Sequence, residues 1–214
     1  MDKRYVALTF DDGPNPSSTR ALLAALKAGG AKATFFVWGE HAVRHPDLLR
    51  ALSTAGMWIG NHGFTHRRLT RLGPRAAYEE IAKTQRTITH ITGRTATLFR
   101  PPYGDTDPAI GSTAAELGLA ETLWTVDTRD WAGAGTGEIA DAAATVQPGG
   151  IILMHDKGYL TTVDAVPFIL RMLADRGLAA GRIDEKTGLA VAPRQPTRTP
   201  PYLSAVRQSP VTLG

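Results

Sequence analysis

The sequence predicts an α/β fold in which helices cover a parallel sheet, arranged either as a (β/α) barrel or as a doubly wound sheet. Short apolar runs alternate along the chain with segments of helical periodicity. The apolar runs are nearly continuous, which is typical of parallel strands that are buried on both faces. In both arrangements, functional residues gather where the strands end.

Six apolar runs are the expected strands: YVALTF at 5–10, ATFFVWG at 33–39, MWIGN at 57–61, TLFR at 97–100, ETLWTV at 121–126 and GIILMH at 150–155. Four segments have apolar residues at helical spacing and are the expected helices. They are STRALLAALKAGG, which begins at Ser18 or Thr19, PDLLRALSTAG at 46–56, PRAAYEEIAKTQRTITHITG at 74–93 and VPFILRMLADRG at 166–177. The sequence has no internal repeat of fixed period.

Residues 1–192 are expected to form one domain. The last segment, 193–214, has five prolines, no acidic residue and no helical period. Such a composition predicts an extended, proline-rich basic tail with no part in catalysis.

The composition excludes several classes of function. The chain has 214 residues and no cysteine, so disulfides, thiolate metal sites and cysteine nucleophiles are excluded. Of the net charge of +4, three charges come from Arg194, Arg198 and Arg207, so the rest of the chain is nearly neutral and a nucleic-acid partner is not expected. The sequence contains no run of 18 apolar residues, so no membrane span is predicted.

The beginning of the sequence bears on localisation. MDKRYVALTF contains no apolar region of signal-peptide length followed by a cleavage site. We expect a secreted protein if a signal peptide precedes this sequence, and a cytoplasmic one if Met1 is the native start. We also expect a monomer.

Two adjacent carboxylates, Asp11 and Asp12, follow the first expected strand. Neighbouring carboxylates repel each other, so holding both at the rim of a core is costly unless a proton, a cation or water relieves them. The sequence Asp-Asp-Gly-Pro is also compatible with an ordinary solvated turn.

Polar residues follow five of the expected strands, and the carboxyl ends of parallel strands meet at one rim. Any one of these groups, taken alone, is explained by a turn or a helix cap. Their coincidence favours a functional site. The residues are Asp11 and Asp12; His62 and His66; Arg100; Asp127, Asp130 and Trp131; and His155 and Asp156.

His62 and His66 stand four residues apart, a spacing that suits a metal. His41 and His45 have the same spacing, but we interpret that pair as solvated surface residues because charged residues flank it. With Asp12 as a third ligand, His62 and His66 form a set of two histidines and one carboxylate that leaves a position open for water. A cation held there relieves the carboxylate repulsion and leaves Asp11 beside the bound water.

Taken together, five motifs resemble those of the polysaccharide deacetylases, the NodB homology domain of carbohydrate esterase family 4. They are TFDDGP at 9–14, NHGFTH at 61–66, RPPYG at 100–104, DTRDW at 127–131 and ILMHD at 152–156. The chain is most similar to the bacterial branch of acetylxylan esterases and chitooligosaccharide deacetylases. The resemblance implies a distorted (β/α) barrel with fewer than eight complete repeats and a metal-dependent carbohydrate deacetylase.

The resemblance also implies a role for individual residues. The metal would be zinc, with Co²⁺ or Ni²⁺ as alternatives, and its ligands would be Asp12, His62 and His66. The catalytic residues would be Asp11 as general base, Arg100 orienting Asp11, and His155 as general acid positioned by Asp130. Substrate would contact the backbone N–H of Tyr103, facing the oxyanion, and the side chains of Trp131 and Leu153, which would wall the acetyl pocket.

One position departs from the family pattern. The second motif commonly has Ser or Thr after its first His, and here that residue is Gly63. We expect the loss of a side-chain hydrogen bond that would have braced this loop.

The expected activity is hydrolysis of N-acetyl groups from oligo- or polysaccharides that contain N-acetylglucosamine, as in chitin. An O-acetylxylan esterase with the same site is the alternative, because base, metal and acid serve an amide and an ester alike. A protein of another class, an inactive carbohydrate-binding protein, would be expected to have lost at least one of the functional residues. A purely structural domain does not explain the five polar strand ends.

Overall fold

The computed structural model describes residues 4–193, so the predicted tail lies almost entirely outside the described part. The strands are β1 (Arg4–Asp11), β2 (Thr34–Val37), β3 (Trp58–Asn61), β4 (Leu98–Phe99), β5 (Ala120–Glu121), β6 (Val126–Asp127), β7 (Ile151–His155), β8 (Leu178–Ala180), β9 (Arg182–Ile183) and β10 (Ala190–Val191). The helices are α1 (Thr19–Ala28), α2 (Gly39–Arg44), α3 (Pro46–Thr54), α4 (Pro74–Thr92), α5 (Pro108–Glu116), α6 (Thr136–Ala143) and α7 (Leu160–Asp175). Short 3-10 turns lie at Leu69–Arg71, Pro102–Gly104 and Asp130–Ala132.

The main sheet is parallel and curls into an incomplete barrel, which confirms the predicted fold class. Its strand order is β5-β4-β3-β2-β1-β7-β6, and β8 pairs with the first residues of β1. The barrel therefore has fewer than eight complete β/α repeats.

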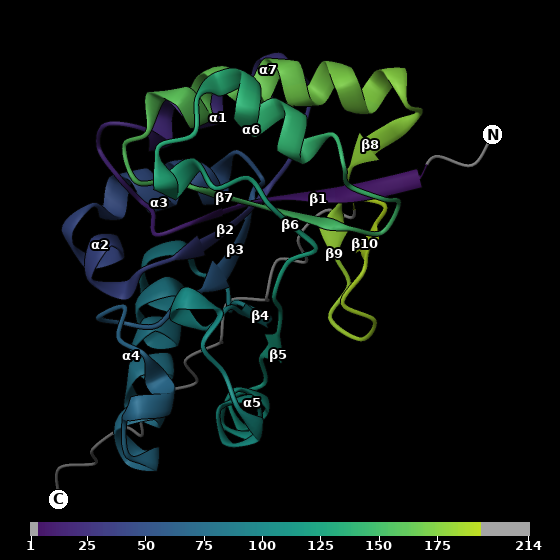
Figure 1. The fold of residues 1–214 in the computed structure, drawn as a ribbon. Helices are drawn as coiled ribbons and strands as arrows, with labels where there is room; N and C mark the ends of the chain where they lie inside the picture. The colour runs from purple at the N-terminus through teal and green to yellow at the C-terminus, as the bar shows by residue number, and fades with distance from the viewer. Residues whose placement is uncertain (1–3, 194–214) are drawn as a thin grey trace, which may run out of the picture.

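The helices form an outer layer around the sheet. In Figure 1, α1, α6 and α7 lie together above the sheet, where α7 contacts both of the others, whereas α4 and α5 lie below it. Residues of β1 alternate between two environments because successive side chains of a strand point to opposite faces. Val6, Leu8 and Phe10 pack in the large core that includes the helices, whereas Ala7 belongs to the smaller core of the barrel interior.

The predicted strand at 121–126 is wrong in its extent. The structure has two separate two-residue strands, of which β5 pairs with β4 at one edge of the sheet and β6 pairs with β7 at the other edge. The residues between them cross the gap in the incomplete barrel, with Thr122 N–H donating to Phe99 and Thr125 N–H donating to Ile151. An apolar segment that spans this gap has the same composition as a buried strand, so the pattern did not distinguish them.

The four predicted helices correspond to α1, α3, α4 and α7. Helices α2, α5 and α6 were not predicted, because they are short and carry few large apolar residues. No helix in the described part of the chain combines the length and the apolar composition that a bilayer crossing requires.

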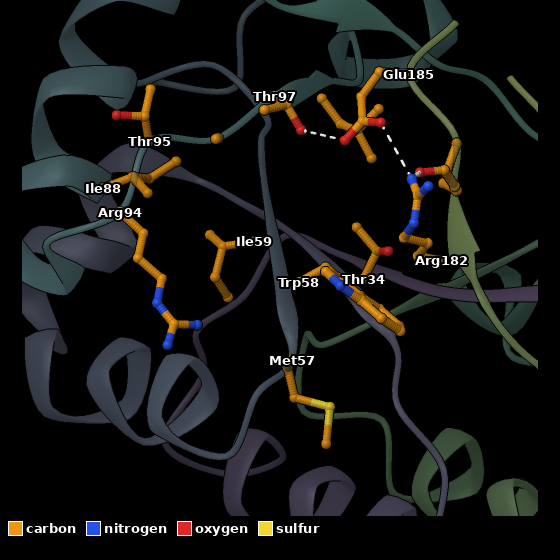
Figure 2. Close-up of a pocket in the computed structure, with 13 residues that line it drawn as sticks. Thr34, Met57, Trp58, Ile59, Ile88, Arg94, Thr95, Thr97, Arg182 and Glu185 are labelled. Atoms are coloured by element: carbon orange, nitrogen blue, oxygen red, sulfur yellow. Dashed lines mark hydrogen bonds and ion pairs between the residues drawn. The ribbon is translucent and has the colours of Figure 1, made fainter. Parts of the chain in front are cut away.

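The amino ends of β2, β3 and β4 border a cavity of about 250 Å³. Strands β3 and β4 pair only at Asn61 and Phe99, so they separate towards their amino ends. Figure 2 shows Glu185 between Thr97 and Arg182, to which it is joined by a hydrogen bond of 2.9 Å and an ion pair of 3.2 Å. The segment around the β9–β10 hairpin thereby covers this end of the barrel.

Candidate active site

The first carboxylate follows directly from the alternation along β1. Ala7 lies on the inner face, and period two places Thr9 and Asp11 on the same face, one above the other towards the carboxyl end. Both side chains contact Arg100, which lies inside the barrel with its guanidinium 4.1 Å from the centre of the Phe36 ring. Asp12 follows at the end of the strand with φ of 74°, and its side chain does not share the Arg100 ion pair of Asp11.

Asp12, His62 and His66 converge on one point, with their ligand atoms all within 4.8 Å of one another. The Nε2 atoms of His66 and His62 lie 2.9 and 3.5 Å from Asp12 Oδ1. Burial alone would raise the pKa of Asp12, but the close approach of the two histidines holds it well below its usual range.

These three residues fit a divalent metal. Asp12 Oδ1 is buried and has no hydrogen-bond partner among the described residues. His62 Nδ1 lies 2.7 Å from the carbonyl oxygen of Arg100, so this nitrogen carries the proton and Nε2 presents its lone pair to Asp12 Oδ1. Outer hydrogen bonds of this kind orient metal-ligating histidines.

Asp11 lies beside the cluster and is held by a buried arginine. Arg100 Nη1 donates to Asp11 Oδ1 at 2.8 Å, and Arg100 is fully buried. Its other donors reach Thr9 Oγ1 and the carbonyl oxygens of Thr122 and Leu123 in the crossing segment. Asp11 Oδ2 is 3.8 Å from His62 Nε2, so one carboxylate oxygen is anchored and the other lies next to the cluster.

His155, at the end of β7, contributes the second titratable pair. Its Nδ1 lies 2.7 Å from Asp130 Oδ1, and its backbone N–H donates to Asp130 Oδ2 at 2.7 Å. Asp130 is fixed further by Thr162 and by the backbone N–H of Trp131. Burial lowers the pKa of His155, but the hydrogen bond and charge of Asp130 outweigh it, and the net shift is upward.

One pocket of about 420 Å³ is lined by Asp11, Asp12, His62, His66 and His155. Leu153 is buried in its wall, whereas Trp131 and Tyr103 are half-exposed at its rim. Lys157 is a further lining residue, and its Nζ lies 3.1 Å from Asp12 Oδ2. The pocket thus has a polar floor and an aromatic rim.

Backbone strain within residues 4–193 is concentrated at this pocket. The non-glycine residues with positive φ are Asp12 at 74°, His66 at 56°, Tyr103 at 64° and Arg129 at 56°. Each such conformation costs about 1 kcal/mol or more, and such residues cluster at functional sites. Two of the four belong to the Asp12, His62 and His66 cluster, and Arg129 directly precedes Asp130.

His41 corrects one interpretation from the sequence. It is not a solvated surface residue, because it is half-buried, its ring lies 4.0 Å from the Trp38 ring, and its Nδ1 lies 2.9 Å from the carbonyl oxygen of Asp12. Flanking charges were a poor guide because α2 packs against the loop that follows β1. His41 braces the strained backbone of Asp12 and contributes no ligand to the cluster.

Two carboxylates that sequence reasoning did not assign hold the loops of the site. Glu80 of α4 accepts hydrogen bonds from the backbone N–H groups of Phe64 and Thr65 and from the Thr65 hydroxyl. Asp156 accepts from the hydroxyls of Ser18 and Thr19 at 2.5 Å each, and burial raises its pKa to about 6 despite these bonds. Both pairings join distant segments, so no local pattern reveals them.

The loop that contains Gly63 is held by other hydrogen bonds. Gly63 has φ of 73°, a conformation that favours glycine, and its N–H donates to Asn61 Oδ1 at 3.0 Å. The three hydrogen bonds to Glu80 brace the rest of the loop. The expected weakening of this loop is therefore offset by Glu80.

A carboxylate-histidine cluster with an open side, flanked by an anchored carboxylate and a histidine–aspartate pair, is typical of metal-assisted hydrolases. The family model for polysaccharide deacetylase matches residues 1–122. The chain belongs to the polysaccharide deacetylase family.

Known relatives cover different shares of the chain. A bifunctional xylanase/xylan deacetylase of Cellvibrio japonicus is 40% identical over 190 residues, which are 88% of this chain and 28% of that protein. A chitooligosaccharide deacetylase of Rhizobium leguminosarum bv. trifolii is 38% identical over 156 residues, 72% of this chain and 73% of that protein. A family 4 carbohydrate esterase from Streptomyces lividans, solved in complex with acetate, is 46% identical with a TM-score of 0.87, covering 89% of this chain and 98% of that one.

Proposed function

We propose that the protein is a metal-dependent deacetylase that hydrolyses N-acetyl groups of oligo- or polysaccharides containing N-acetylglucosamine. The observation that carries this proposal is the arrangement of three elements around one pocket: the Asp12, His62 and His66 cluster, the anchored carboxylate of Asp11, and the pair of His155 and Asp130. Membership of the polysaccharide deacetylase family supports it independently.

Asp12, His62 and His66 would hold the metal, for which zinc is the first candidate. When bound, a divalent metal polarises the acyl carbonyl and lowers the pKa of a water molecule. Asp11 is the general base that takes the proton of the attacking water. Arg100 prepares it for this role by fixing one carboxylate oxygen and leaving the other beside the cluster.

His155 is the general acid. The departing amine or alcohol must gain a proton, and the raised pKa of His155 keeps its ring protonated at higher pH. Because Nδ1 bonds to Asp130, the proton to be transferred is the one on Nε2. Asp130 is thus a positioning residue that also stabilises the charged ring.

The acetyl group and the sugar occupy different parts of the pocket. Leu153 and Trp131 form the apolar wall against the methyl group, and the backbone N–H of Tyr103 meets the negative charge that develops on the carbonyl oxygen. Tyr103 has a φ of 64°, a strained conformation at the rim of the pocket. The exposed Trp131 and Tyr103 rings provide apolar faces for the sugar ring.

The O-acetyl ester of xylan is the second candidate substrate. The relative from Cellvibrio is a xylan deacetylase and the one from Rhizobium is a chitooligosaccharide deacetylase, so both chemistries occur among similar proteins. An amide has a poorer leaving group than an ester, so its hydrolysis demands more of the general acid His155. The hydrogen bond between His155 and Asp130 therefore favours the amide as substrate.

Acetate release from N-acetylchitooligosaccharides and from acetylxylan, measured in parallel on metal-stripped protein with and without added zinc, tests the proposal. Zinc-dependent release from the chitooligosaccharides supports N-deacetylation, whereas release from xylan alone assigns the esterase activity. Bound zinc without release from either substrate contradicts the proposal and favours an inactive carbohydrate-binding protein.

A further inference from the structure

A second hollow adjoins the catalytic pocket on the side of His66. It has a volume of about 340 Å³ and shares His66, Arg68 and Tyr103 with the catalytic pocket. A substrate chain bound at the catalytic pocket would therefore continue into this hollow, which we call the arginine groove. Its remaining lining residues are Arg67, Arg71 and Leu72.

The arginines of the groove are presented by an anchored turn. Leu69 is fully buried, and Thr70 donates its hydroxyl proton to Asp105 Oδ2 at 2.9 Å. Arg68 pairs with Asp105 at 3.3 Å, and its guanidinium lies 4.4 Å from the centre of the Tyr103 ring. The turn therefore holds the arginine backbones in place while the guanidinium groups reach the surface.

The positive charge of the groove is compensated only in part. Within residues 4–193, no carboxylate lies within 4.0 Å of the Arg67 or Arg71 guanidinium, and none lines the groove. Of the three guanidinium groups, only that of Arg68 is paired with a carboxylate, that of Asp105. On another part of the catalytic pocket wall, the half-exposed Lys157 is paired with Asp12.

We propose that the arginine groove binds a carboxylate carried by a sugar near the acetylated one, so that the preferred substrate is an acidic acetylated glycan. This inference rests on the proposed deacetylase function. A guanidinium presents a planar set of donors that matches a carboxylate, and Tyr103 supplies an adjacent apolar face. A neutral glycan would use none of this charge.

The charge pattern of the whole chain favours a local anion over a polyanion such as nucleic acid. Three of the four net positive charges lie in residues 194–214, so the rest of the chain carries a net charge of only +1. Nucleic-acid binding requires a broad basic surface. Here, three arginines gather in one groove beside the catalytic pocket.

The test compares substrates that differ only in the carboxylate. The first probe is an acetylated xylooligosaccharide bearing glucuronic acid, with its carboxyl-reduced form as partner. The second is a peptidoglycan strand with free lactyl carboxylates, with its methyl ester as partner. We expect the zinc-loaded protein to prefer the carboxylate form of at least one pair in kcat/KM, through KM, and to lose this preference at high salt. The pair that shows the preference identifies the source of the carboxylate.

A double variant, R67Q/R71Q, is expected to reduce this preference about tenfold, since each exposed charge contact contributes a factor of a few. The matched control R50Q/R171Q removes the same charge from α3 and α7, far from the groove in sequence, and is expected to keep the preference. Thermal unfolding of both variants checks that they are folded.

Each result separates the two proposals. Zinc-dependent turnover of N-acetylchitooligosaccharides with no carboxylate preference overturns the arginine groove and leaves the proposed function intact. A preference that survives in R67Q/R71Q, or that falls equally in the control, also overturns the groove. If no acetylated glycan is turned over, both proposals are overturned.

Discussion

The two ends of the barrel each hold a largely buried arginine, and the two arginines have different kinds of partner. Arg100, at the carboxyl ends of the strands, bonds to Thr9, to Asp11 and to two carbonyls of the crossing segment, all distant in sequence. Arg182, at the amino ends, bonds to Asp184, to Glu185 and to the Ile183 carbonyl, all within three residues. The first network joins separate strands around a pocket, and the second holds together a local turn that covers the barrel.

Because the two networks differ, substitutions at the two ends of the barrel should have different effects. The catalytic end keeps a buried carboxylate oxygen next to a candidate metal cluster, so a change there should alter chemistry. The other end keeps its charged groups paired with one another at the edge of a cavity. A change there should alter stability and leave the chemistry in place.

The largest expected effect is that of Asp11→Asn. Removing a general base typically lowers kcat by about 10²- to 10⁴-fold. The amide keeps the shape and one hydrogen bond to Arg100, and the cluster of Asp12, His62 and His66 stays intact. Acetate release should therefore collapse while the zinc content, measured by elemental analysis, remains at one per chain.

Asp184→Asn is the matched control at the opposite end, because it makes the same isosteric change in a carboxylate paired with an arginine. We expect a lower melting temperature and full acetate release. If Asp11→Asn retained wild-type kcat, the base assignment would be wrong and the functional contrast between the two ends would disappear.

Asp130→Asn should have the next largest effect on kcat. Burial works against protonation of His155, and Asp130 is the main group that raises its pKa. Without this charge the pKa falls, so the protonated ring is lost at lower pH, and the alkaline limb of the kcat profile moves towards acid. At neutral pH, we expect kcat to fall roughly 10- to 100-fold, with partial recovery at lower pH.

Thr162→Val separates charge from structure at this position, because it removes one hydrogen bond to Asp130 and keeps its charge. This control should lower the melting temperature and leave the pH profile in place. An unshifted profile in Asp130→Asn would contradict the general-acid assignment of His155.

The sequence predicted that polar residues gather at one end of the barrel, because strand ends in a parallel sheet share one rim. Asp12, His62 and His66 each follow a recognisable apolar run, so their convergence follows from the sequence pattern alone. The α/β class followed from the alternation of apolar runs and helical segments, whereas the choice of a barrel over a doubly wound sheet came from the family resemblance. These predictions depend on the order of short segments along the chain and not on any long-range contact.

The parts that could not be predicted depend on distant partners. Glu80 is one of two adjacent glutamates on α4, and only the packing of that helix against the loop at 63–65 gives it three hydrogen bonds. The positive φ of Tyr103 has no signature in residue type. The split of 121–126 into β5, a crossing and β6 depends on where the barrel closes.

Arg182→Gln should have a smaller effect, confined to stability. Its side chain is 12% exposed, and its loss breaks two ion pairs and a hydrogen bond to the Ile183 carbonyl. We expect a cost of about 1 kcal/mol, which lowers the melting temperature by about 2–4 °C for a domain of this size. Calorimetry measures this shift, and kcat should stay at the wild-type value; a fall in kcat would show that the two ends are coupled.

The smallest expected effect is that of Thr34→Val, on the inner face of β2 beside the cavity. Thr34 is fully buried, and its hydroxyl has no hydrogen-bond partner among the described residues, so the folded protein bears an uncompensated desolvation cost. Valine has nearly the same shape without the hydroxyl, and β-branched residues suit a strand. We expect a stabilisation of up to about 1 kcal/mol, seen as a raised melting temperature with unchanged acetate release. A lowered melting temperature would mean that water in the cavity bonds to the hydroxyl, and the amino end would then be a hydrated polar site like the catalytic end.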